Sequence, residues 1–85
     1  MTAYTIGVDF GTNSVRAIVA SCANGATIGT AVFDYPSGDA GILVDPGDPH
    51  LARQHPGDYL EGLRDSIRGA LADAAGESGF SPSAV

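Results

Sequence analysis

The sequence has 85 residues and a formal net charge of −6 at neutral pH, and this length allows at most one small domain. Its 44% hydrophobic content, with 12 glycines and 5 prolines, indicates a globular chain with many turns and not a disordered tail. Four arginines and no lysine exclude a sequence-independent grip on nucleic acid or anionic lipid, because both need many cations. Any bound phosphate must therefore be held mainly by backbone N–H groups, a metal ion or one well-placed arginine.

The cysteine content and the N-terminal sequence indicate the cellular compartment. The one cysteine, Cys22, cannot form an intramolecular disulfide and is interpreted as a core residue at a strand end. The N-terminus lacks the basic region and apolar run of a secretory signal, and no apolar stretch approaches the roughly 20 residues of a membrane span. The sequence therefore predicts a cytoplasmic protein without a membrane partner.

The first predicted elements form an antiparallel hairpin. Residues 4–10 alternate in character and are rich in β-branched and aromatic side chains, which predicts a strand with Asp9 on the face opposite its apolar residues. Residues 11–13 predict a tight turn in which Gly11 supplies backbone freedom. A second strand is predicted over residues 14–22, antiparallel to the first.

A third strand and a long loop follow. Asn24-Gly25 is the strongest short hairpin signal in the chain, and it leads into a strand predicted over residues 26–35. Residues 37–54 are rich in glycine, proline and aspartate, which predicts a long loop holding at most a short strand at residues 42–44. Loops of this length in compact domains are usually functional or disordered.

An amphipathic helix is predicted over residues 55–75. Pro56 suits the first helical position, and His55 before it is interpreted as a surface or capping residue. Gly62 and Gly69 each cost the helix about 1 kcal/mol relative to alanine, so the helix is expected to depend on packing. The apolar residues at helical spacing predict a core stripe of Tyr59, Leu60, Leu63, Ile67, Leu71 and Ala74.

The turn between the first two strands gathers groups suited to phosphate. It places Asp9 at the mouth of a hairpin whose backbone N–H groups are expected to point into a concave turn. A carboxylate beside phosphate requires a cation, so Asp9 is the predicted ligand of Mg²⁺, directly or through water. The other predicted phosphate-binding residues are Gly11, Thr12, Asn13, Ser14 and Arg16. From the residues alone, a plain hairpin without a ligand is the alternative.

Residues 7–17 carry a family resemblance. Their sequence, Gly-Val-Asp-Phe-Gly-Thr-Asn-Ser-Val-Arg-Ala, resembles the first phosphate motif, Asp-x-Gly-Thr-x-x-x-Arg, of the actin-like ATPase superfamily in the form used by FGGY carbohydrate kinases. Within that family the chain is most similar to the L-ribulokinases, because the match extends through residues 22–25, 35–36 and 54–60. The resemblance covers nearly the whole chain.

The resemblance implies a fold and an activity. The implied fold class is α/β: the N-terminal part of a ribonuclease H-like (actin-like ATPase) domain, with an antiparallel three-stranded start of a mixed sheet followed by a helix. Residues 1–85 would then be an incomplete piece of the first kinase domain. The full-length parent would phosphorylate L-ribulose to L-ribulose 5-phosphate in arabinose catabolism, using ATP and Mg²⁺.

The resemblance also assigns roles to residues and partners. Asp9 would lie near the metal ion and Arg16 near the transferred phosphate. No catalytic residue falls within the chain, which is therefore expected to be inactive alone. ATP and a pentulose sugar are the expected partners of the full-length protein, nucleic acid and membranes are not, and homo-oligomerisation is left open.

Three alternatives stay open. Another kinase of the same family, acting on xylulose, ribitol or glycerol, would share the phosphate hairpin. A non-kinase ATPase of the superfamily, actin-like or chaperone-like, would share only that hairpin, and the match at residues 54–60 speaks against it. The third alternative is a small non-catalytic binding module that uses the acidic loop 39–48 and the helix as an interaction surface.

Overall fold

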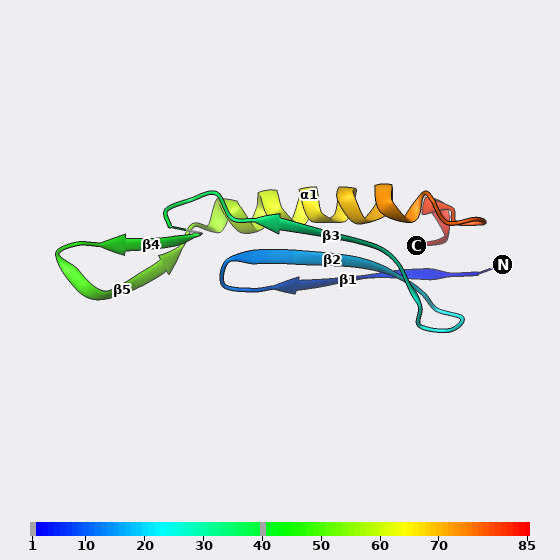
Figure 1. The fold of residues 1–85 in the computed structure, drawn as a ribbon, viewed down its shortest axis with the longest axis horizontal. Coiled ribbons are helices and arrows are strands. Elements are labelled where there is room, and N and C mark those ends of the chain that lie inside the picture. Colours follow the sequence, from blue (N-terminus) through cyan, green and yellow to red (C-terminus); the bar gives the residue numbers. More distant parts are fainter. Residues whose placement is uncertain (1, 40) are drawn as a thin grey trace.

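A computed structural model describes residues 2–39 and 41–85, with Pro49 described by its backbone only. One long helix lies along a three-stranded sheet, and a separate two-stranded hairpin projects beyond the end of this pair of layers (Figure 1). The elements, in chain order, are β1 (Tyr4–Phe10), β2 (Ser14–Ser21), β3 (Thr27–Asp34), β4 (Ile42–Asp45), β5 (Asp48–Gln54), α1 (Pro56–Ala74) and the short 3₁₀ helix η1 (Pro82–Ala84). No helix in the described part of the chain is both long and apolar enough to span a membrane.

The larger sheet has the order β1-β2-β3, with both pairs antiparallel. Tyr4 lies opposite Ser21 and Phe10 opposite Val15, so β1 and β2 are in register over their length. The predicted strands at 4–10, 14–22 and 26–35 are confirmed to within one residue at each end. The predicted antiparallel sheet followed by a helix is likewise confirmed.

Two turns use glycine in different ways. Gly25 has a φ of 74°, the left-handed region that favours glycine, and Asn24 Oδ1 accepts a hydrogen bond of 2.9 Å from the Ala26 N–H. The hairpin predicted at Asn24-Gly25 is therefore confirmed. Gly11 has no positive φ, so the backbone freedom predicted for it is not needed. A Cβ there would lie 3.1 Å from the Ser14 carbonyl oxygen, so the requirement at Gly11 is one of space.

The core lies between α1 and the sheet and is built from small side chains. In β2, the central strand, Val15, Ala17 and Val19 are fully buried. The buried positions of α1 recur every four residues: Asp58, Gly62, Ser66, Ala70 and Ala74. The predicted stripe is therefore wrong at Leu60, which is 72% exposed. It is confirmed at Ala74, which is fully buried, and at Ile67 and Leu71, which pack against the core.

Close approach of the backbones explains this small-residue core. A Cβ at Gly29 of β3 would lie 2.3 Å from the Ala70 carbonyl oxygen, and one at Gly62 would lie 2.7 Å from Val15 Cγ1. Gly69 is equally close to β3. The glycines that weaken the intrinsic helix propensity are thus the residues that let α1 approach the sheet.

The start of α1 agrees with the prediction. His55 is the N-cap, and its Nδ1 accepts a hydrogen bond of 2.9 Å from the Gly57 N–H, while Pro56 occupies the first turn. The interpretation of His55 as a capping residue is confirmed.

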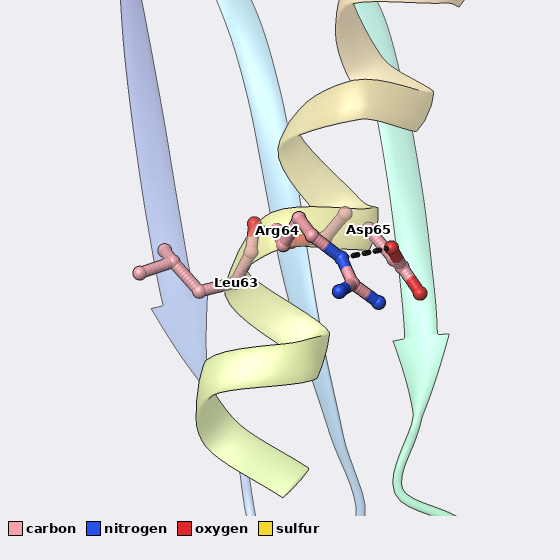
Figure 2. A network of polar contacts seen from close by, with 4 residues as sticks. Leu63, Arg64 and Asp65 are labelled. Atoms are coloured by element: carbon pink, nitrogen blue, oxygen red, sulfur yellow. Dashed lines mark hydrogen bonds and ion pairs between the residues drawn. The ribbon is translucent and has the colours of Figure 1, made fainter. Parts of the chain in front are cut away.

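The solvent side of α1 carries a local ion pair. Arg64 Nε donates to Asp65 Oδ1 at 2.9 Å, and Figure 2 shows this pair directed away from Leu63. The hydrogen bond lowers the pKa of the Asp65 carboxyl below its ordinary value. Exposed pairs of this kind contribute little to stability because water screens them.

Residues 37–54 differ in part from the prediction of a long loop: the short strand predicted at residues 42–44 is present as β4, and β5 is an additional strand. Most of the segment forms the β4–β5 hairpin, with Ile42 opposite Gln54 and Leu43 opposite Arg53. The ribbon pairs through its backbone, and no second layer covers it within residues 2–39 and 41–85, so β5 needs no alternation of apolar and polar residues. Sequence periodicity therefore gave no signal for β5.

Cys22 also differs from its prediction as a core residue. The strand β2 ends at Ser21, and Cys22 is exposed in the turn that follows.

Candidate functional site

The six predicted phosphate-binding residues lie on one hairpin, at the end of the sheet where α1 begins (Figure 1). Asp9 and Arg16 belong to the paired strands, and the residues between β1 and β2 form an exposed turn. We call residues 11–14 the phosphate turn. The structure therefore gathers all the predicted residues at one place.

Asp9 and Arg16 lie directly opposite each other in the β1–β2 ladder. Side chains alternate between the faces of a strand, and the neighbours of Arg16 on β2 are buried against α1, so both charged residues face away from the helix. On this open face they line a hollow of about 300 Å³ together with Gly7, Val8 and Ile18.

The charges in this hollow are not neutralised by an ion pair. Within residues 2–39 and 41–85 the one ion pair is Arg64–Asp65, at the far side of the helix. Asp9 therefore offers a carboxylate to a cation, and Arg16 offers a guanidinium to an anion, at the rim of the same hollow. The hollow itself is lined almost entirely by apolar surface, so these two charged groups at its rim are what it offers to a metal-bound phosphate.

Three carbonyl groups of the phosphate turn, those of Thr12, Asn13 and Ser14, accept hydrogen bonds from the protein. The Gly11 N–H donates to the Ser14 oxygen at 2.8 Å, and the Tyr35 N–H donates to the Asn13 oxygen at 3.0 Å. The Thr12 oxygen accepts from Nε2 of Gln54. The Gly11 N–H, one of the predicted donors, thus already has an acceptor inside the turn.

An aromatic cluster supports this end of the sheet and was not foreseen from the sequence. The Tyr59 ring packs edge to face against Phe10, with centroids 5.6 Å apart, and against Tyr35, with centroids 5.4 Å apart. The Tyr59 hydroxyl donates to Oε1 of Gln54. The signal that could have found this group is the pairing of Gln54 with Tyr59 across the helix start, inside the segment 54–60 that carries the family resemblance.

Two buried polar groups lie beside the cluster. Asp58 is 4% exposed, and its carboxylate accepts from the Ser37 hydroxyl at 2.7 Å and from the Ser37 N–H at 3.2 Å. Tyr35 is 3% exposed, and its hydroxyl has no hydrogen-bond partner among the described residues. Burial raises the pKa of the Tyr35 hydroxyl, and the charges of Tyr59, Asp58 and Asp9 raise it further.

The donor set fits a hard cation held chiefly by its substrate. No group of three or more His, Cys, Asp or Glu side chains converges anywhere in the described residues, so the chain builds no all-protein metal cage there. Mg²⁺ is typically bound by one or two carboxylates, with waters and substrate phosphates completing its coordination. Asp9, next to the hydroxyl-bearing phosphate turn, is compatible with that pattern.

Comparison with known proteins identifies relatives of the chain. No family model matches it. The ribulokinase of Shouchella clausii is 45% identical over 71 residues, which cover 79% of this chain and 13% of that protein. The ribulokinase of Mycolicibacterium smegmatis is 43% identical over 77 residues, covering 84% of this chain and 14% of that protein. The ribulokinase of Geobacillus thermodenitrificans is 35% identical over 86 aligned positions, covering 96% of this chain and 14% of that protein.

The names of these relatives indicate a kinase family that acts in carbohydrate metabolism. The particular family is the ribulokinases, to which this chain is related over most of its length, and the resemblance found in its sequence is confirmed. The chain spans 13–14% of the length of these curated relatives.

Proposed function

We propose that this chain is the phosphate-binding segment of an ATP-dependent ribulokinase, which converts L-ribulose to L-ribulose 5-phosphate in the cytoplasm as a step of arabinose catabolism. The observation that supports this most strongly is the identity of 45% and 43% to two ribulokinases over most of the chain. The segment would be the N-terminal part of a ribonuclease H-like kinase domain, with the sugar site and catalytic base outside it.

Each residue of the hairpin has a definite task in this proposal. Mg²⁺, when bound with ATP, neutralises charge on the phosphates and screens it from the attacking hydroxyl. Asp9 holds that ion directly or through water. Arg16, on the paired strand, attracts the phosphate being transferred, and its position opposite Asp9 keeps the two groups on the same face.

The remaining donors belong to the phosphate turn. The hydroxyls of Thr12 and Ser14, together with the amide of Asn13, surround the phosphate oxygens. Gly11 contributes through the shape of the turn, because its N–H donates to the Ser14 oxygen. With a net charge of −6, the chain does not attract ATP through its overall charge, so these local donors and the metal ion must supply the binding.

The test is ADP release by the full-length protein that carries this chain, with Mg-ATP and a panel of ribulose, xylulose, ribitol and glycerol. We expect ribulose to give the highest kcat/KM. Asp9→Asn, which keeps the size and removes the charge, should lower kcat/KM by about 100-fold or more, as the loss of a transition-state electrostatic group typically does.

Glu61→Gln is the matched control, because it removes one carboxylate from the exposed side of α1. It should leave kcat/KM unchanged. Absence of ADP release with every sugar in a folded protein would refute the kinase, and preference for another polyol would refute ribulose alone. Equal activity of Asp9→Asn and the parent would refute the metal-binding role.

A further inference from the structure

We infer that Gln54 is a positioning residue that sets the orientation of the Thr12–Asn13 peptide in the phosphate turn. This inference rests on the proposed function, because it concerns how the same turn receives phosphate. Gln54 is the last residue of β5, and it is 42 positions from Thr12 in the sequence. It does not touch substrate in this account, and it acts through the turn.

The side chain of Gln54 makes two hydrogen bonds that fix its amide. Oε1 accepts from the Tyr59 hydroxyl, so the amide oxygen faces the helix and the NH₂ group faces the turn. Nε2 then donates to the Thr12 carbonyl oxygen. Tyr59 is itself held between the rings of Phe10 and Tyr35, so the donor is presented from a rigid group.

The consequence follows from peptide geometry. In a trans peptide the C=O of one residue and the N–H of the next point in opposite directions, and the described chain contains no cis peptide. Holding the Thr12 carbonyl against Gln54 therefore directs the Asn13 N–H away from Gln54. A rotated peptide would instead present a carbonyl oxygen to a phosphate oxygen, and the two partial negative charges would repel each other.

A side chain holds the Thr12 carbonyl, whereas backbone groups hold the next two carbonyls of the turn. The Asn13 and Ser14 carbonyls are held by backbone N–H groups of Tyr35 and Gly11, which no substitution removes except proline. Thr12 is exposed, so packing does not fix its peptide. A change at Gln54 thus removes one side-chain hydrogen bond from the turn, while the backbone hydrogen bonds to the Asn13 and Ser14 carbonyls stay in place.

The experiment measures binding of ADP and of adenosine to the full-length protein by calorimetry, alongside the KM values for ATP and ribulose. Gln54→Met keeps the length of the side chain and removes the donor. We expect the Kd for ADP and the KM for ATP to rise roughly fivefold to tenfold, the factor that a lost hydrogen bond typically gives. The Kd for adenosine, which has no phosphate, and the KM for ribulose should stay unchanged.

Three further variants sharpen the test. Gln54→Glu keeps the acceptor for Tyr59 but turns a carboxylate toward the Thr12 carbonyl, so it should weaken ADP binding more than Gln54→Met does. Tyr59→Phe should weaken ADP binding less than Gln54→Met does. The double variant Tyr59→Phe/Gln54→Met should bind ADP as well as Gln54→Met alone, because both changes act on one contact. Val44→Gln, on the exposed surface of β4, is the control and should change nothing.

The outcomes separate the inference from the proposed function. If the parent protein shows no ribulose-dependent ADP release, the proposed function is refuted, and the inference with it. If the parent is active but its Gln54→Met form binds ADP normally, the inference alone is refuted. The inference alone is also refuted if Gln54→Met weakens the binding of adenosine and ribulose as much as that of ADP and melts more than about 2 °C lower. That is the behaviour of a purely structural residue.

Discussion

At the scale of single residues, the hydroxyl of Tyr35 stands out because it is buried and, in the part of the chain that the structure describes, has no hydrogen-bond partner. A buried polar group left unsatisfied costs about 1–3 kcal/mol. We therefore expect Tyr35→Phe to raise the free energy of unfolding of the 85-residue chain by roughly 1 kcal/mol, as measured by urea titration at neutral pH. Tyr59→Phe is the matched control and should lower it, because the Tyr59 hydroxyl donates to Gln54. Equal effects of the two variants would contradict this assignment.

The same hydroxyl gives stability a defined pH dependence. Its pKa is raised above the ordinary value of 10.0 in the folded chain, first by burial and then by nearby charges. As the pH rises past that value the unfolded chain loses the proton first, so the unfolded state is favoured increasingly until the folded pKa is passed. Ionisation of Tyr35 therefore leaves the free energy of unfolding unchanged below pH 10 and lowers it progressively above pH 10. Urea titrations at pH 8 to 11 should show a steeper decline for the parent chain than for Tyr35→Phe.

At the scale of elements, the contact between α1 and the sheet reverses the usual effect of a glycine substitution. On an exposed helix, glycine to alanine stabilises by about 1 kcal/mol. A Cβ at Gly62 would lie 2.7 Å from Val15 Cγ1 and 3.0 Å from Phe33 Cδ1. Overpacking of this kind costs typically 1–3 kcal/mol, so Gly62→Ala should lower the free energy of unfolding.

Urea titration of Gly62→Ala beside Gly76→Ala checks that sign. Gly76 follows the helix, and a Cβ there would have its nearest contact at 3.6 Å, an ordinary distance. We expect Gly76→Ala to be neutral within about 0.5 kcal/mol. If Gly62→Ala were the more stable variant, the helix could not approach the sheet as closely as described.

The elements also show what local pattern can predict. The three strands of the larger sheet and α1 carry alternation, hairpin or helical periodicity within their own residues, and these signals gave their bounds. The β4–β5 ribbon lacks a buried face, so its second strand left no pattern to detect. The helix face was misjudged at Leu60 because the width of the contact depends on glycines in both layers, and sequence spacing does not reveal how closely two backbones approach.

The candidate site divides in the same way. The placement of Asp9 and Arg16 on one hairpin could be predicted because the motif that holds them is local. Their roles toward metal and phosphate stay predictions. The link from Gln54 to Thr12 could not, since it joins positions 42 residues apart and depends on where β5 ends. Side chains that position a site from a distant segment leave no periodic signal, and they become visible only once the fold brings the segments together.

At the scale of the whole molecule, the chain is long and thin. Its extents are 57 × 18 × 15 Å and its radius of gyration is 15.9 Å, whereas a compact chain of this length would have about 12 Å. The helix covers one face of the larger sheet, and lies mainly over β2 and β3. The other face, with the Asp9–Arg16 hollow and the 52% exposed Val32, has no layer over it in the described residues.

This shape predicts that the 85-residue chain alone is only marginally stable and inactive. Its fully buried apolar residues are mostly valine and alanine, which bury little area each, and the hydrophobic gain grows with that area. Thermal unfolding followed by circular dichroism should therefore give a broad transition at low temperature. The same residues within the full-length protein should melt cooperatively with it. A sharp, reversible transition in a monomer of the isolated chain would show that one helix over three strands suffices for a stable core.

Ribulose-dependent ADP release should occur in the full-length protein alone, because phosphoryl transfer needs a base and sugar contacts that must come from other segments.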